Sequence, residues 1–329
     1  MHLGIYFDGF SSASEILEIC HEAEASGVDS LWFAQHMGYR EAMIMAAAAS
    51  AVTKKAWLVP TAITPYLWPA LSVAMSMATM DELAPGRNKI AVSVGNVLNL
   101  SESGAAPVKP VRVIREYVSA LRKLLAGESV TMDGAVQTLR GAHMEFGKNA
   151  NIPIYVASTG PQVLRLAGQI GDGILLSAGM TLANCRRCLD MVDAGAISDG
   201  RDPSAVRKAG FINFQVSNDG PAAKAALLRK LAYLFRSKGH AENIKSSGLN
   251  IDHEGIIAAL SRRDLDAATR LLPLEAADVF GVAGTPKECR DRLEAYLSIG
   301  LSEPIIEIGG NPEERRLGLE VVRELAGRL

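Results

Sequence analysis

Short apolar runs alternate with longer amphipathic runs along almost the whole chain, and this alternation constrains the fold more than any other feature. The short runs resemble buried strands, and the longer ones repeat their apolar residues at helical spacing. Eight strands are expected, at residues 3–8, 30–35, 56–63, 89–96, 152–158, 173–179, 209–217 and 303–310. These runs are apolar on both faces, as in a parallel sheet that helices cover. The pattern predicts an α/β protein built as a (β/α)8 TIM barrel with insertions.

A doubly wound open sheet is the alternative fold, but it usually has fewer strands and begins with a Gly-rich turn that this sequence lacks. Residues 130–146 are predicted to form a β-hairpin, and residues around 237–280 an insertion before the last barrel unit. A length of 329 residues, with 48% hydrophobic residues, suits one barrel. No low-complexity linker divides the chain, so residues 1–329 are expected to form a single domain.

The charge pattern argues against nucleic-acid and membrane partners. The formal net charge is −2 and no block of Lys and Arg stands out, so no nucleic acid is expected to bind. Charged residues, Gly or Pro interrupt every long apolar run, which leaves no candidate for a membrane span. Residues 1–5 lead directly into a strand and lack the pattern of a signal peptide, so a cytoplasmic location is expected.

No metal site is expected. Cys185 and Cys188 form a CxxC pair within a helical run, but a zinc site would need a second pair or nearby histidines. The two thiols are therefore expected to be structural or surface groups.

The carboxyl ends of the strands are the expected place for chemistry, because TIM-barrel enzymes carry their reacting groups there. The rule selects a set of small, polar and ionisable residues: Asp8, His36, Thr61, Ala62, Ile63, Ser93, Gly95, Asn96, Ser158, Thr159 and Gly160.

The turn Ser158-Thr159-Gly160-Pro161 has a composition that suits an anion. The first N–H groups of a helix are unpaired and lie at the positive end of its dipole, so they attract phosphate. Two hydroxyls add donors, and Gly160 allows a ligand to approach the backbone. The alternative is an ordinary helix cap with no ligand.

Four ordered segments resemble the bacterial luciferase-like superfamily: residues 23–37, 64–96, 156–176 and 280–301. The stretch "VASTGPQVLRLAGQIGDGILL" resembles the superfamily's run of strand, phosphate-binding turn, helix and strand. Together with "RGAHMEF" at residues 140–146, it is most similar to the branch that uses the deazaflavin coenzyme F420, which includes the 5,10-methylenetetrahydromethanopterin reductases.

The resemblance implies where a cofactor would bind. It implies a phosphate site at Ser158, Thr159 and Gly160. It implies a non-prolyl cis peptide bond after the third strand, within Thr61, Ala62 and Ile63 and most plausibly between Ala62 and Ile63. It also implies that Ser93, Gly95 and Asn96 contact the ring edge or ribityl chain.

Catalytic roles are expected for His36 and Asp8. The resemblance implies a His or an acid near the reactive face of the coenzyme at the position of His36, where it could pass a proton to the substrate. Asp8 ends the first strand and is a second candidate acid. The alternatives are a histidine and an aspartate that belong only to rim loops.

The activity implied is hydride transfer between reduced F420 and a small organic substrate, for which a methylenetetrahydromethanopterin-like C1 carrier is one candidate. An FMN-dependent luciferase-like monooxygenase is one alternative, and a non-catalytic flavin-binding barrel is another. Arg40 and Lys109 are candidate partners for the acidic tail of F420, or else solvated surface charges. The run at residues 41–53 is apolar on more than one face, which predicts a homodimer.

Overall fold

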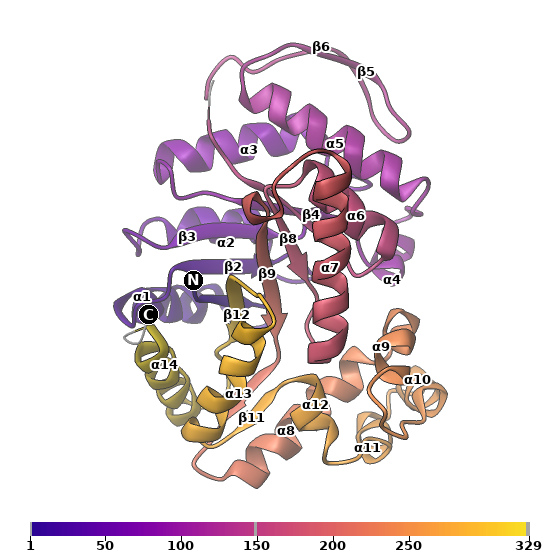
Figure 1. The fold of residues 1–329 in the computed structure, drawn as a ribbon. Coiled ribbons are helices and arrows are strands. Elements are labelled where there is room, and N and C mark those ends of the chain that lie inside the picture. Colours follow the sequence, from indigo (N-terminus) through magenta and orange to yellow (C-terminus); the bar gives the residue numbers. More distant parts are fainter. Residues whose placement is uncertain (1, 148–149, 327–329) are drawn as a thin grey trace.

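The computed structural model describes residues 2–147 and 150–326 and contains an eight-stranded parallel sheet that curls into a barrel (Figure 1). Its strands run in the order β3 (Trp57–Thr61), β2 (Ser30–Ala34), β1 (Gly4–Phe7), β12 (Glu303–Glu307), β9 (Arg207–Ile212), β8 (Gly173–Leu176), β7 (Ile154–Ala157) and β4 (Ile90–Ser93). The first and last strands of this order meet through parallel bridges between Leu58 and Asn88 and between Ile63 and Val92. The predicted TIM-barrel fold is confirmed.

Helices follow the barrel strands and cover the outside of the sheet (Figure 1). The long ones are α1 (Ala13–Ala25), α2 (Ala42–Ala49), α3 (Ala70–Leu83), α5 (Pro110–Leu125), α6 (Pro161–Ile170), α7 (Leu182–Ser198), α8 (Gly220–Leu234), α13 (Pro286–Ser298) and α14 (Pro312–Ala326). Capping residues start several of them: Ser12, Thr181 and Asp219 each accept a hydrogen bond from a first-turn N–H. Thr285 and Glu288 form a capping box at α13.

Two segments leave the barrel, and one expected barrel strand differs from the structure. The predicted hairpin consists of the antiparallel strands β5 (Val130–Asp133) and β6 (Thr138–Ala142). The segment after α8 holds the short helices α9 (Ala241–Lys245), α10 (His253–Ser261), α11 (Leu265–Arg270) and α12 (Ala276–Phe280). The expected strand 209–217 breaks at Asn213, however, because β10 (Phe214–Val216) pairs with β11 (Val282–Gly284) outside the barrel sheet.

The barrel interior is filled by its own cluster of side chains, separate from the core between sheet and helices. Its buried members alternate with outward-facing residues along the strands, as the pleat requires. They are Tyr6, Trp32, Val59, Ala91, Tyr155, Leu175, Ala209 and Ile305. The interior is therefore a packed core with room for a ligand only at its ends.

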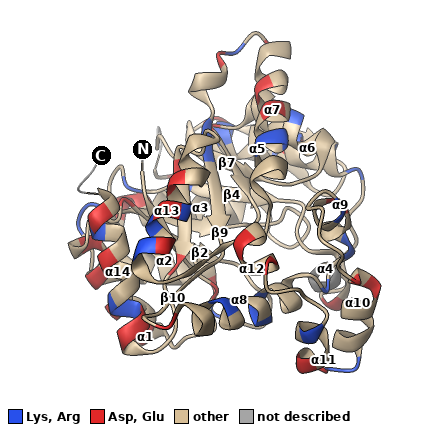
Figure 2. Ribbon diagram, turned by 60° about the horizontal axis from the view of Figure 1, so that its bottom comes forward, with Lys and Arg blue, Asp and Glu red and all other residues tan. Residues whose placement is uncertain are grey.

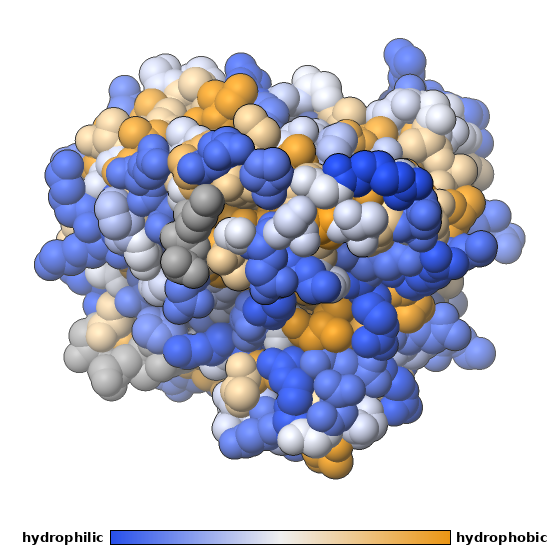
Figure 3. Space-filling view, turned by 90° about the horizontal axis from the view of Figure 1, so that it is seen from above, coloured by the Kyte–Doolittle hydropathy of each residue, from blue (hydrophilic) through white to orange (hydrophobic). Residues whose placement is uncertain are grey.

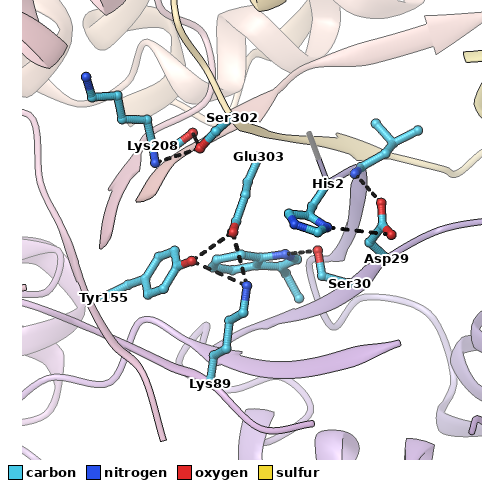
Figure 4. Close-up of polar contacts among 10 residues, drawn as sticks. His2, Asp29, Ser30, Lys89, Tyr155, Lys208, Ser302 and Glu303 are labelled. Carbon is cyan, nitrogen blue, oxygen red and sulfur yellow. Dashed lines mark hydrogen bonds and ion pairs between the residues drawn. The ribbon is translucent and has the colours of Figure 1, made fainter. Parts of the chain in front are cut away.

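A buried polar cluster lies beneath this layer, at the amino ends of the strands (Figure 4). The ammonium of Lys89 lies 3.1 Å from Oε1 of Glu303, and the hydroxyl of Tyr155 donates to the same carboxylate at 2.9 Å. Burial lowers the pKa of Lys89, and the Glu303 carboxylate opposes that shift. The amino ends of TIM-barrel strands serve stability rather than chemistry, so we assign this cluster to the fold.

Candidate functional site

A cavity of about 240 Å³ opens at the carboxyl ends of the barrel strands. Its lining comes from six of the eight strands or the turns that follow them: Ala34, Gln35, His36, Thr61, Ala62, Ser93, Ala157, Ser158, Thr159, Leu175, Leu176, Ser177 and Phe211. The structure thus brings together six of the predicted site residues, namely His36, Thr61, Ala62, Ser93, Ser158 and Thr159. Asp8, Ile63, Gly95, Asn96 and Gly160 lie outside this lining.

Apolar side chains form the deep wall of the cavity. Leu175 and Phe211 point into the barrel, and the Phe211 ring packs on the Tyr6 ring with centroids 4.6 Å apart. Sequence analysis named the ends of these strands but not Phe211. The period-2 alternation could have found it, because Ala209 and Phe211 occupy inward positions of one strand.

A non-prolyl cis peptide bond does occur after the third strand, but between Thr61 and Ala62 rather than between Ala62 and Ile63. Ile63 is fully buried, and its N–H donates to the carbonyl of Ala91 at 2.9 Å while its own carbonyl accepts from Ser93. These bonds close the barrel, so Ile63 belongs to the wall and Ala62 to the cavity. The Thr61 hydroxyl is buried and has no hydrogen-bond partner among the described residues.

The turn after β4 contributes less to the cavity than expected. The Ser93 hydroxyl lines the cavity and accepts from the Gly95 N–H at 3.0 Å. Gly95 has a φ of +88°, and a Cβ there would lie 3.2 Å from the Thr64 hydroxyl, so the turn itself requires glycine. The Asn96 carbonyl accepts from Leu100 at the start of α4 (Val97–Glu102).

The turn between β7 and α6 leaves the helix N-terminus without a side-chain cap. The Ser158 hydroxyl accepts from the Gly160 N–H at 3.1 Å, and Gly160 is the N-cap residue. None of the described side chains accepts from the first-turn N–H groups of α6. Because Ser158 and Thr159 also line the cavity, hydroxyl and N–H donors meet at one edge of it.

His36 is oriented by the first strand. Its Nδ1 lies 3.0 Å from the backbone carbonyl of Asp8, an acceptor that requires a proton on Nδ1. In the neutral ring the Nε2 atom is then free to accept a proton. The rings of Phe10 and Tyr39 lie beside the imidazole, with centroids 5.9 and 6.5 Å away.

Asp8 lies next to a buried acid–base network. Glu307, at the end of β12, accepts hydrogen bonds from the Tyr6 hydroxyl at 2.9 Å and from the Lys230 ammonium at 2.8 Å. Burial raises the pKa of Asp8, and the charge of Glu307 adds to that rise. The Phe10 N–H, which donates to the Asp8 carboxylate at 2.9 Å, opposes the rise most, and the charges of His36 and Lys230 oppose it further. The environment therefore raises the pKa of Asp8 above the ordinary range of an aspartate.

Two further observations concern metal ligands and helix length. Within residues 2–147 and 150–326, no group of three His, Cys, Asp or Glu side chains is arranged to hold a metal ion. Cys185 and Cys188 are buried free thiols in α7. Over the same part of the chain, no helix combines the length and apolarity needed to cross a bilayer.

The sequence profile of the luciferase-like monooxygenases matches residues 3–303. The chain belongs to the luciferase-like family. Among curated members, it is 28% identical over 322 residues to the 5,10-methylenetetrahydromethanopterin reductase of Methanolobus tindarius, covering 95% of this chain and 98% of the relative. It is 27% identical to the F420-dependent glucose-6-phosphate dehydrogenase of Rhodococcus erythropolis, covering 96% of this chain and 93% of that one.

Solved structures of luciferase-like proteins share this fold. The coenzyme F420-dependent tetrahydromethanopterin reductase from Methanopyrus kandleri superposes with a TM-score of 0.89 at 22% identity, over 98% of this chain and 97% of that one. A type II Baeyer–Villiger monooxygenase from Pseudomonas putida, in complex with FMN, gives a TM-score of 0.69 at 16% identity, over 99% of this chain and 97% of that one. At these identities the likeness supports the fold alone.

Proposed function

We propose that this luciferase-like protein is an oxidoreductase that transfers a hydride between coenzyme F420 and a small organic substrate. The observation that carries the proposal is the cavity itself, with the uncapped N-terminus of α6 at one edge, an apolar wall and an oriented histidine. Relatives matched over nearly the full length are named as F420-dependent enzymes or as methylenetetrahydromethanopterin reductases, which supports this coenzyme.

The residues present fit the coenzyme. Leu175, Phe211 and Ala62 offer an apolar surface for a flat ring, and the unpartnered Thr61 hydroxyl offers a buried hydrogen-bonding group. Ser158 and Thr159, with the N-terminus of α6, would hold the phosphate. When bound, the coenzyme supplies or accepts the hydride.

His36 and Asp8 would handle the proton that accompanies the transfer. The Asp8 carbonyl fixes a proton on Nδ1 of His36, so that Nε2 accepts or donates a proton at the mouth of the cavity. Asp8 would act as a nearby acid, because a raised pKa makes its carboxyl more readily protonated than that of an ordinary aspartate. These two groups argue against a non-catalytic barrel, and we retain an FMN-dependent monooxygenase as the second candidate.

A methylenetetrahydromethanopterin-like C1 carrier is our first candidate substrate. It rests on the names of three relatives, and the glucose-6-phosphate dehydrogenase names of three others support a different small substrate. The test is an anaerobic assay that follows the visible absorbance of the oxidised coenzyme. Reduced F420 is mixed with the protein and the methylene carrier, which would accept the hydride, and oxidised F420 is mixed with the protein and glucose 6-phosphate, which would donate it. Turnover of one candidate identifies the substrate class. In a separate aerobic assay, oxygenation of a substrate with reduced FMN, together with no reaction of F420, would favour the monooxygenase.

We further propose a cytoplasmic homodimer formed by a single domain. All four cysteines are free thiols, as expected for a reducing compartment. Helices α2 and α3, which contact each other, expose large apolar side chains, with Ile44 at 68% and Leu83 at 59% exposure. Hydrophobic patches lie among hydrophilic side chains on the face seen in Figure 3. Light scattering should give twice the mass of one chain, and a monomer at micromolar concentration would contradict the dimer.

A further inference from the structure

A second, shallow cavity of about 410 Å³ lies between helices α6 and α7, outside the barrel, and no step proposed above uses it. Its lining is Arg165 from α6 together with Ala183, Arg186, Arg187, Asp190, Met191 and Ala194 from α7. We call it the α6–α7 groove. The basic and acidic residues of these helices are marked in Figure 2.

The base of the groove is formed by a close crossing of the two helices. A Cβ on Gly168 would lie 2.0 Å from the Val192 carbonyl, and one on Gly195 would lie 2.1 Å from the Arg165 carbonyl. The two backbones therefore touch, and only glycine permits this approach. The crossing fixes the basic side chains relative to each other.

The groove is positively charged in a chain whose formal net charge is −2. Arg186 is paired with Asp190 at 3.2 Å. Arg165 makes no ion pair or side-chain hydrogen bond with another described residue. Arg187 donates to the neutral amide oxygen of Asn184 at 2.6 Å, which positions the guanidinium and leaves its charge uncompensated. Two cationic groups thus remain available to an anion.

The groove and the barrel-end cavity are linked through the chain, because α6 and α7 follow two strands whose ends line that cavity. Ser158 and Thr159 line that cavity just before α6, and Ser177 lines it at the end of β8, before α7 begins. Arg165 comes four residues after the start of α6 and Arg187 five residues after the start of α7. At 1.5 Å per residue each lies about 6–8 Å along the helix axis from the N-terminus of its own helix.

We propose that the α6–α7 groove binds the anionic tail of the coenzyme, an inference that rests on the proposed function. The phosphate of F420 is extended by glutamate residues whose carboxylates match guanidinium groups. A phosphate held at the α6 N-terminus places the tail at the open end of the groove. Arg40, the earlier candidate for this role, instead donates to the carbonyls of Gly9 and Phe10.

The test compares F420 with the same coenzyme lacking its glutamates, using fluorescence quenching at low salt. The double variant Arg165→Gln/Arg187→Gln is compared with Arg140→Gln/Arg262→Gln, which removes the same charge outside the groove. Two exposed charge contacts predict that the unaltered protein binds the glutamate-bearing form about fivefold more tightly. The groove variant should lose this preference and keep its affinity for the shortened form, and high salt should reduce the preference.

An equal preference in the groove variant, the control variant and the unaltered protein would overturn the tail site while leaving the proposed function intact. So would equal binding of the two forms by the unaltered protein. Binding of neither form would contradict the proposed function, and the tail site with it. Circular dichroism of both variants checks that they are folded.

Discussion

The hydrogen bond from the His36 ring to the Asp8 carbonyl determines what the histidine can do. It fixes one ring nitrogen as a donor, so proton transfer is confined to Nε2. His36→Gln should therefore lower the turnover rate at saturating coenzyme by about a hundredfold or more, with little change in coenzyme affinity. Stopped-flow reduction and binding titrations measure the two quantities. His143→Gln, an exposed histidine near the hairpin, is the matched control. An unchanged turnover rate in His36→Gln would exclude the proton-transfer role.

The pH dependence tests Asp8. Burial and then the Glu307 charge raise the pKa of Asp8, so removing that charge by Glu307→Gln should lower it. Asp8 would then lose its proton at a lower pH, and the limb of the rate profile that requires protonated Asp8 should move to lower pH. Glu145→Gln, on an exposed residue, should leave the limb in place. A limb that stays in place in Glu307→Gln, or moves upward, contradicts the assignment.

Which residues face the cavity could be predicted only in part. The rule that chemistry lies at strand ends found His36 and Ser158 from their order in the chain. The same rule could not show that Gly95 serves the geometry of its turn rather than a ligand, because its close approach to Thr64 depends on the closed barrel. The cis bond was placed one residue late for the same reason: the barrel-closing bonds of Ile63 are tertiary.

At the scale of elements, the N-terminus of α6 combines a ligand-accessible turn with a tightly packed helix. A Cβ on Gly160 would meet only the Ser158 hydroxyl at 3.7 Å, so Gly160→Leu should leave the fold intact. Its side chain should nevertheless block the phosphate and abolish measurable coenzyme binding. Gly168→Ala should behave in the opposite way: it should lower the stability by about 1–3 kcal/mol, because its Cβ would overlap the Val192 carbonyl. Thermal unfolding and titration separate the two effects. Unchanged coenzyme affinity in Gly160→Leu would remove the phosphate site.

The long periodic elements and the β5–β6 hairpin were predictable, but the β10–β11 pair was not. The helices and barrel strands bury regular apolar faces, so their spacing in the sequence carries the information. Strands β10 and β11 have three residues each and exist through their pairing with each other, which no local pattern records. The prediction of one continuous strand at 209–217 was therefore wrong, because the segment divides into β9 and β10.

At the scale of the molecule, the two ends of the barrel are expected to have separate roles. The Lys89–Glu303 pair is almost completely buried, with side-chain exposures of 7% and 1%. Glu303→Leu leaves a buried ammonium unpaired and should cost about 3–5 kcal/mol, whereas Lys89→Met/Glu303→Leu should recover most of that loss. Denaturant unfolding measures both, and coenzyme binding by the double variant should be unchanged. A single variant as stable as the double would show that the pair is not coupled.

Coenzyme identity is the central claim, and dissociation constants for F420 and FMN, measured on the same preparation by fluorescence quenching, test it most directly. Both have a phosphate for the α6 turn and a flat ring for the apolar wall, so the comparison isolates the deazaflavin ring and the acidic tail. We predict micromolar or tighter binding of F420 and much weaker binding of FMN. Micromolar binding of FMN with no detectable binding of F420 would contradict the account and favour a monooxygenase.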